Sequence, residues 1–260
     1  MKPRDHIGWS FSGQDGLDAL AGPFLAEGAA RGERLMYVLA EPDPRAADRL
    51  DRWLDPGLVQ VASIAEVYGA SGIVDEVAQR ATFTAALAEA QAQGCSGIRV
   101  AADNTPLVTD ERRLAAWLRW ELMADRFMSE NRVTGLCAFD RGLVSMDRLR
   151  HLATLHPLSS ADTPTPQYRL FSEAGTLRIE GTIDLFTIDQ LRLALEVLPD
   201  DTAVVIDLDT ATLTGSRPQA GLRRLAETGV SVTIRGLPAE LEELAATGLA
   251  VTGRLVLQAH

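Results

Sequence analysis

The chain has 260 residues, of which 46% are hydrophobic, and its formal net charge is −11. This length is enough for one large domain or two modest ones. The negative charge argues against a protein that binds nucleic acid or an acidic membrane surface. No apolar run reaches the roughly 18 residues of a transmembrane helix, and MKPRDHIGWS lacks the apolar stretch of a signal peptide. We therefore expect a cytoplasmic protein with no membrane partner.

The first 156 residues alternate between strand and helix patterns. Apolar runs predict strands at residues 6–11, 35–39, 58–62, 97–101 and 133–139. Helical spacing predicts helices at 17–28, 44–54, 75–93, 109–131 and 145–155, with Thr109 as the cap of the longest. Gly32 and Gly94 are expected to end helices. This order predicts an α/β domain over residues 1–156, with a parallel sheet covered by helices on both faces.

The stretch PLSSADTPTPQ, residues 157–167, is rich in proline and small polar residues and is interpreted as a linker. Beyond it, residues 168–260 are expected to form a second, smaller α/β domain. Strand patterns lie at 168–171, 177–180, 203–208, 230–234 and 254–257, and helix patterns at 188–198, 217–228 and 238–247.

The turn after the first strand has the position of a phosphate-binding loop but not its residues. The run SGQDGLDALAG lacks the lysine and hydroxyl of GxxxxGK[ST], and Asp15 and Asp18 would repel phosphate. The only lysine is Lys2, which also excludes a buried-lysine mechanism in the folded body. We expect no nucleotide hydrolysis and interpret this turn as a tight connection from strand to helix.

The cysteines and histidines show no metal-binding spacing. Cys95 and Cys137 are expected to be buried, reduced thiols, and there is no CxxC or HxxxH pair. His6 opens the first strand and is interpreted as a satisfied strand-end residue. The sequence therefore predicts no metal site and no cofactor.

Several segments of the first domain together resemble a known sensory family. They are PFLAEGAARGERLMYVLAEP, GCSGIRVAADNTP, the Trp-rich helix with ELMADRFM, VTGLCAFDR and HLATLHPL. Their order and spacing over residues 5–158 resemble the MEDS domain, the methanogen/methylotroph sensory domain, a RecA- and KaiC-like relative. The resemblance implies a RecA-like fold without ATPase chemistry that senses small molecules such as hydrocarbon derivatives.

A ligand in an open parallel sheet binds at the carboxyl ends of the strands. The candidate ligand residues there are polar or aromatic. The polar ones have an alternative interpretation, in which they cap helices or lie in solvent-exposed loops. The candidates are Trp9, Ser10, Ser12, Tyr37, Glu41, Asp103, Asn104, Asp140 and Arg141.

The second domain resembles the STAS domain of anti-sigma factor antagonists. The resemblance rests on LRIEGTIDLFTIDQLRLAL, AVVIDLDTATLTGS and VSVTIRGLPAELEELAATGL, with Gly181 and Asp184 in the turn before a helix. It implies binding to an anti-sigma factor or another sigma-regulatory protein, and phosphorylation of Ser216. In LTGSRPQAGLRRL, however, Gly215 stands where the family has aspartate, and Arg217-Pro218 replaces a small residue and glycine. Ser216 could instead only cap a helix.

We therefore expect a non-enzymatic bacterial signalling regulator in transcription control. The N-terminal domain would sense a small molecule and the C-terminal domain would bind a sigma-regulatory protein. One alternative is a scaffold that has lost both switches. Another is a hydrolase that uses the strand-end carboxylates Glu41, Asp103 and Asp140, although no GxSxG motif is present.

Overall fold

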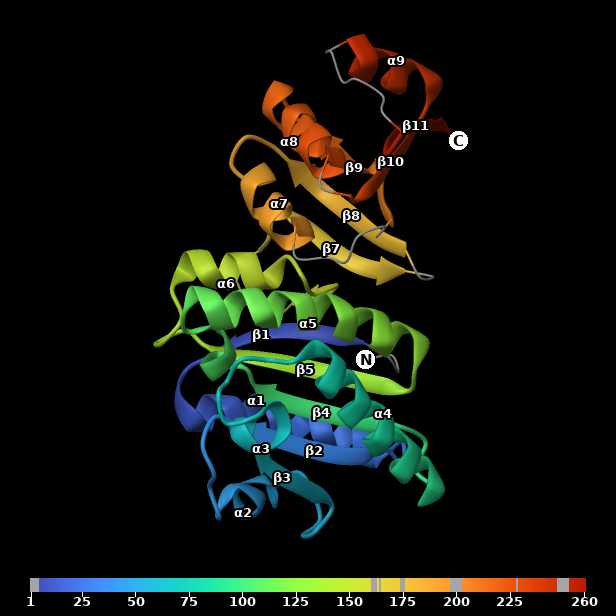
Figure 1. Ribbon diagram of the computed structural model, residues 1–260. Helices are drawn as coiled ribbons and strands as arrows, with labels where there is room; N and C mark the ends of the chain where they lie inside the picture. The colour runs from blue at the N-terminus through green and yellow to red at the C-terminus, as the bar shows by residue number, and fades with distance from the viewer. Residues whose placement is uncertain are drawn as a thin grey trace. The chain divides into compact units, whose positions relative to one another are not determined.

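The computed structural model describes residues 5–159, 163, 165–173, 176–196, 203–227, 229–246 and 253–260, without the side chains of Glu173, Glu196, Ser216, Leu225 and Ala226. The chain divides into two compact units, Met1–Thr165 and Pro166–His260 (Figure 1).

The first unit is built on a six-stranded, all-parallel sheet with the strand order β3-β2-β4-β5-β1-β6. Parallel strands need crossover connections, and helices between successive strands supply most of them. The strands are β1 (His6–Phe11), β2 (Arg34–Leu39), β3 (Val59–Ser63), β4 (Ile98–Asp103), β5 (Val133–Asp140) and β6 (Leu158–Ser159).

Helices cover both faces of this sheet, with α1 behind it and α4 and α5 in front (Figure 1). The expected α/β fold is therefore confirmed. The helices are α1 (Gly13–Ala29), α2 (Ala46–Leu50), α3 (Ile64–Tyr68), α4 (Glu76–Ala92), the 3-10 turn η1 (Thr105–Val108), α5 (Glu111–Glu130) and α6 (Met146–Ala153).

The longest helix begins two residues later than the sequence predicted. The Asp110 carboxylate accepts a hydrogen bond from the backbone N–H of Arg113 at 2.9 Å, so Asp110 rather than Thr109 caps α5. A short helix, α3, was not expected. It begins with a capping box in which Ser63 and Glu66 bond to each other's backbone N–H.

Part of the predicted linker belongs to the first sheet. Leu158–Ser159 pairs with β1, and the N–H of Ser10 donates to Oγ1 of Thr163 at 3.0 Å. β1 would otherwise end the sheet with unpaired backbone groups, and this short strand covers them. The division between the units therefore follows Thr165, inside the stretch 157–167.

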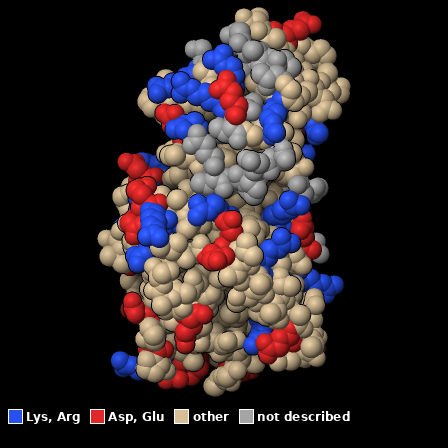
Figure 2. Space-filling model, in the orientation of Figure 1, with Lys and Arg blue, Asp and Glu red and all other residues tan. Residues whose placement is uncertain are grey.

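The first unit also buries one arginine. Arg99 on β4 is fully buried, its Nε lies 2.5 Å from Oε2 of Glu33, and its guanidinium lies over the ring of Phe24. Most other charged side chains lie at the surface. Figure 2 shows acidic and basic groups intermixed on the visible face of the first unit.

The second unit has a five-stranded mixed sheet with the order β11-β10-β9-β8-β7. The β7–β8 pair is antiparallel and the other pairs are parallel. Its elements are β7 (Tyr168–Glu173), β8 (Thr176–Ile183), α7 (Ile188–Glu196), β9 (Ala203–Leu213), α8 (Ser216–Glu227), β10 (Ser231–Gly236), α9 (Pro238–Ala246) and β11 (Leu255–Ala259).

None of the helices in the described part of the chain is long and apolar enough to cross a membrane.

Candidate functional site

Several predicted ligand residues do meet at one edge of the first sheet. Strands β4, β5 and β1 are neighbours, so Asp103, Asp140 and Arg141 follow or end adjacent strands. Nε of Arg141 donates to Oγ of Ser12 at 2.5 Å, and Asn104 lies buried beside Asp103. Burial raises the pKa of Asp103, whose carboxylate accepts the N–H of Thr105 at 3.0 Å. These contacts fix the positions of the polar side chains at this edge of the sheet.

The remaining predicted residues lie elsewhere. Tyr37 is fully buried and donates its hydroxyl to Asp18 at 2.6 Å, a role in the core. Trp9 packs against the core, Ser10 is buried, and Glu41 is exposed after β2. In the second unit, Ser216 begins α8, but its side chain lies outside the described residues.

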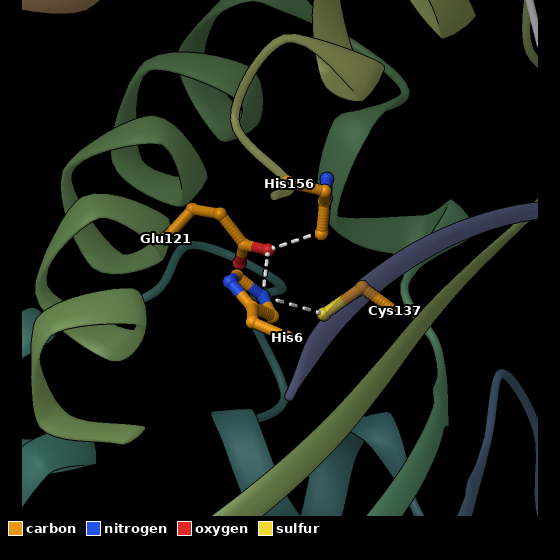
Figure 3. Close-up of side chains that lie close together, drawn as sticks. All are labelled: His6, Glu121, Cys137 and His156. Carbon is orange, nitrogen blue, oxygen red and sulfur yellow. Dashed lines mark hydrogen bonds and ion pairs between the residues drawn. The ribbon is translucent and has the colours of Figure 1, made fainter. Parts of the chain in front are cut away.

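A denser group of functional side chains, not predicted as a site, lies buried near the α5 face of the sheet. It consists of His6, Glu121, Cys137 and His156, the buried cluster (Figure 3). His6, Glu121 and His156 are at most 1% exposed, and Cys137 is 7% exposed. Figure 3 shows Glu121 pointing toward both imidazole rings and Cys137 pointing toward His6.

The alternation of the two central strands helps to place these side chains. Residues of β1 face alternate sides, so Ile7 and Phe11 enter the core beside α1 while His6 and Gly8 face the other way. In β5, Leu136 likewise enters that core, and Cys137 faces the cluster. The parallel register sets His6 opposite Gly135 and Gly8 opposite Cys137.

A glycine makes room for one ring of the cluster. A Cβ added to Gly8 would lie 2.6 Å from Cγ and Nδ1 of His156, closer than side-chain atoms approach. Without that side chain, His156, which follows α6, packs directly against β1. The glycine therefore determines where His156 can lie.

Two histidines converge on one carboxylate oxygen. Nε2 of His6 lies 2.9 Å from Oε1 of Glu121, and Nε2 of His156 lies 2.7 Å from the same atom. Sγ of Cys137 lies 3.6 Å from Nε2 of His6. The cluster thus brings nitrogen, oxygen and sulfur atoms within 4.8 Å of one another.

The other nitrogen of each ring contacts an acceptor. Nδ1 of His156 lies 2.9 Å from the carbonyl oxygen of Leu152, which can only accept, so this nitrogen carries the hydrogen. Nδ1 of His6 lies 3.0 Å from Oδ1 of Asp125. If both Nδ1 atoms are donors, each neutral ring directs a lone pair from Nε2 at the Glu121 carboxylate. Lone pairs and a carboxylate repel one another. The arrangement therefore requires a positive charge between Glu121 and the two rings, either protons on Nε2 or a cation.

The mutual contacts shift the pKa values in the cluster. Burial alone would lower the pKa of His6, but the charge of Glu121 and the bond to Asp125 raise it well above its usual value. Burial opposes ionisation of Glu121, yet the charge of His6 and the contact with His156 lower its pKa to about 2. Burial and the charge of Glu121 raise the pKa of Cys137 to about 12. Without a cation, Cys137 is therefore a neutral thiol.

A small apolar cavity adjoins the cluster. Its volume is about 20 Å³, room for roughly one water-sized molecule. Glu121 and Cys137 form part of its wall, and the rest is mainly apolar and aromatic, with Tyr68, Phe83, Val100, Ala102, Trp120, Ala124, Phe127, Met128, Val133, Gly135 and Leu136.

Sequence reasoning missed this cluster because its members are scattered from residue 6 to residue 156. One signal was available in the long helix. Glu121 and Asp125 stand four residues apart among the inward-facing apolar residues of α5, and both are buried. A pair of acids on an apolar helix face needs buried partners, which His6 supplies.

A comparison with models of known protein families identifies the family of this chain. Residues 5–157 match the family described as MEDS, the MEthanogen/methylotroph, DcmR Sensory domain. The chain belongs to the MEDS family. The predicted resemblance of the first domain is thereby confirmed, and the buried cluster lies within the matched MEDS domain. No curated protein matches the chain. The family description indicates a sensory, signalling role for residues 5–157.

Proposed function

We propose that this protein is a non-enzymatic signalling regulator in which the MEDS domain senses a small molecule and the second unit binds a sigma-regulatory protein. The family match over residues 5–157 carries the sensory part. The apolar cavity beside the cluster supports it, because its apolar and aromatic wall suits a small apolar molecule. Any ligand larger than roughly one water-sized molecule needs the lining side chains to move.

The proposal for the second unit rests on its resemblance to STAS domains. Asp184 begins the turn before α7, and its Oδ1 accepts the backbone N–H groups of Phe186 and Thr187 at 2.8 and 3.0 Å. Leu185 and Phe186 are 47% and 73% exposed and adjoin in this turn, and contiguous exposed apolar side chains are typical of contact surfaces. Nη2 of Arg217 lies 3.5 Å from Oδ2 of Asp189, so the start of α8 is close to the start of α7.

A dianion near residue 216 would therefore alter the charge close to this surface. Phosphorylation of Ser216 would add about two negative charges at the start of α8. We propose that this change controls partner binding, which makes anti-sigma factors or other sigma-regulatory proteins the partner class.

Capture of the full-length protein from its native cells, with identification of bound proteins by mass spectrometry, tests the partner. Recovery of a sigma-regulatory protein is expected, and Ser216→Asp should change the amount recovered. Ser71→Asp adds the same charge to an exposed loop of the first unit and should not. Equal recovery of the partner with both variants would favour the alternative of a scaffold without switches. Absence of any sigma-regulatory protein would contradict the proposal.

Native mass spectrometry of the same preparation tests the sensory part. A retained small molecule is expected in the wild type and lost in Ala124→Val, which fills the cavity. Ala115→Val, on the same helix outside the cavity wall, should retain it. Loss in both variants or neither would count against the cavity as the ligand site. Turnover of nucleotides or esters by the purified protein would refute the non-enzymatic assignment.

A further inference from the structure

We propose that the buried cluster binds one divalent transition-metal ion through Nε2 of His6 and His156, Sγ of Cys137 and a carboxylate oxygen of Glu121. This inference deepens the proposed sensory function, on which its biological meaning rests, because it identifies the chemistry at the wall of the cavity. The metal site itself can be tested without any ligand or partner.

The spacing of the four donor atoms fits a small ion. A tetrahedral ion with bonds of about 2.0–2.3 Å keeps its ligand atoms roughly 3.3–3.8 Å apart. The Sγ of Cys137 already lies 3.6 Å from Nε2 of His6. The contacts of Glu121 with the two rings, at 2.9 and 2.7 Å, would lengthen by a small rotation of its side chain.

Both histidines are oriented as metal ligands are. A ligating histidine usually donates its second ring N–H to a carboxylate or a backbone carbonyl, which fixes the tautomer and the ring position. Asp125 takes this place for His6, and the carbonyl of Leu152 takes it for His156. Each Nε2 is thereby directed at the centre of the cluster.

The charges and donor types select the class of ion. The Glu121 carboxylate and the Cys137 thiolate would balance the charge of a divalent cation. The adjoining Asp125 carboxylate, which contacts Nδ1 of His6 at 3.0 Å, would leave the whole buried group with one negative charge. Two imidazoles and a thiolate suit Zn²⁺, Co²⁺ and related ions, whereas Ca²⁺ and Mg²⁺ prefer oxygen ligands. Binding would release to solvent the thiol proton of Cys137 and the protons that the two Nε2 atoms hold in the ion-free cluster, because all three atoms must offer a lone pair to the ion.

The position of the cluster connects the ion to sensing. Glu121 and Cys137 contribute both to the cluster and to the wall of the apolar cavity. A molecule in that cavity would therefore lie beside two of the four ligands. It could change the coordination of the ion, which is a direct route from binding to a structural response.

Titration of the full-length, chelator-treated protein with Co²⁺ tests the proposal. We expect one equivalent of Co²⁺ to give visible absorption bands of a tetrahedral ion together with a thiolate-to-cobalt charge-transfer band. One equivalent of Zn²⁺ should abolish both signals. Absence of these bands at one equivalent in the folded wild type would overturn the proposal and leave the cluster as a proton-sharing ion-pair network.

Matched variants identify the ligands. Cys137→Ser should lose the charge-transfer band, whereas Cys95→Ser, which changes the other cysteine outside the cluster, should keep it. His260→Ala should also keep it. It removes an exposed Asp207-Asp209-His260 group that could take Co²⁺ without sulfur. A charge-transfer band that persists in folded Cys137→Ser would refute the assignment, and circular dichroism of each variant establishes folding.

Two further outcomes separate this inference from the proposed function. Stoichiometric Co²⁺ binding without a recovered sigma-regulatory protein would support the metal site and count against the partner. Recovery of the partner by a protein that binds no Co²⁺ would overturn the metal site alone.

Discussion

Gly8→Ala is a sharp test of how the buried cluster is packed. The added Cβ would lie 2.6 Å from two ring atoms of His156. The His156 ring is fully buried and has neighbours that restrict its movement, with ring centroids of Phe139 at 6.1 Å and Trp117 at 6.3 Å. The ring must therefore shift, or β1 must move away from it.

The cost follows from these contacts. Forcing one extra carbon into a packed interior costs about 1–3 kcal/mol. A shifted His156 also loses its bond to the carbonyl of Leu152, which is worth about 0.5–1.5 kcal/mol. Together they predict a loss of about 2–4 kcal/mol in the free energy of unfolding. With a urea dependence of about 2 kcal/mol per molar, the midpoint falls by about 1–2 M.

Urea unfolding followed by tryptophan fluorescence measures this loss in the first unit alone. All four tryptophans of the chain lie there, at positions 9, 53, 117 and 120. Chelator-treated protein should be used, so that the result reports packing without metal binding.

A control and a double variant identify the cause. Gly16→Ala lies in α1, where the nearest atom to an added Cβ is 3.8 Å away, so stability should hold or rise by up to about 1 kcal/mol. In a His156→Ala background, Gly8→Ala should cost much less, because the clashing ring is gone. A wild-type midpoint for Gly8→Ala, or an undiminished cost in the double variant, would refute this reasoning.

Three other changes have expected outcomes in the same unfolding assay. Arg99→Ala leaves Glu33, whose side chain is only 7% exposed, without its close partner and should cost about 3–5 kcal/mol, whereas Arg99→Met should cost less; equal costs would contradict a charge effect. Burial raises the pKa of Asp103, so the folded state keeps this proton to higher pH and the associated stability is lost as pH rises above about 4. Asp103→Asn should therefore gain stability relative to wild type between pH 4 and pH 7, and a difference independent of pH would refute this. Tyr37→Phe removes the hydroxyl bonded to Asp18 and should cost about 1–2 kcal/mol, and an unchanged midpoint would show that this bond contributes nothing.

Much of the fold could be predicted from the local pattern of apolar residues. Apolar runs such as Leu35–Leu39 and the helical spacing between them predicted a parallel sheet covered on both faces, because crossover connections permit few other arrangements. The missing loop lysine is the observation on which the prediction of no nucleotide hydrolysis rests, and that prediction stays untested. The start of α5 was misplaced because Thr109 and Asp110 are both good caps, and only the backbone path shows which side chain meets the free N–H groups.

The buried cluster depended on tertiary structure. His6, Glu121, Cys137 and His156 follow no ligand spacing, since they come from β1, α5, β5 and the segment after α6. The sheet order, which makes β1 and β5 neighbours, brings His6 and Cys137 together. The packing of α5 then adds Glu121. The sequence by itself determined most of the segments that become strands and helices, because periodicity is local; short elements such as α3 and β6 were the exceptions. Only the tertiary structure decided which polar side chains share one buried space, because that depends on strand order, register and the room left by Gly8.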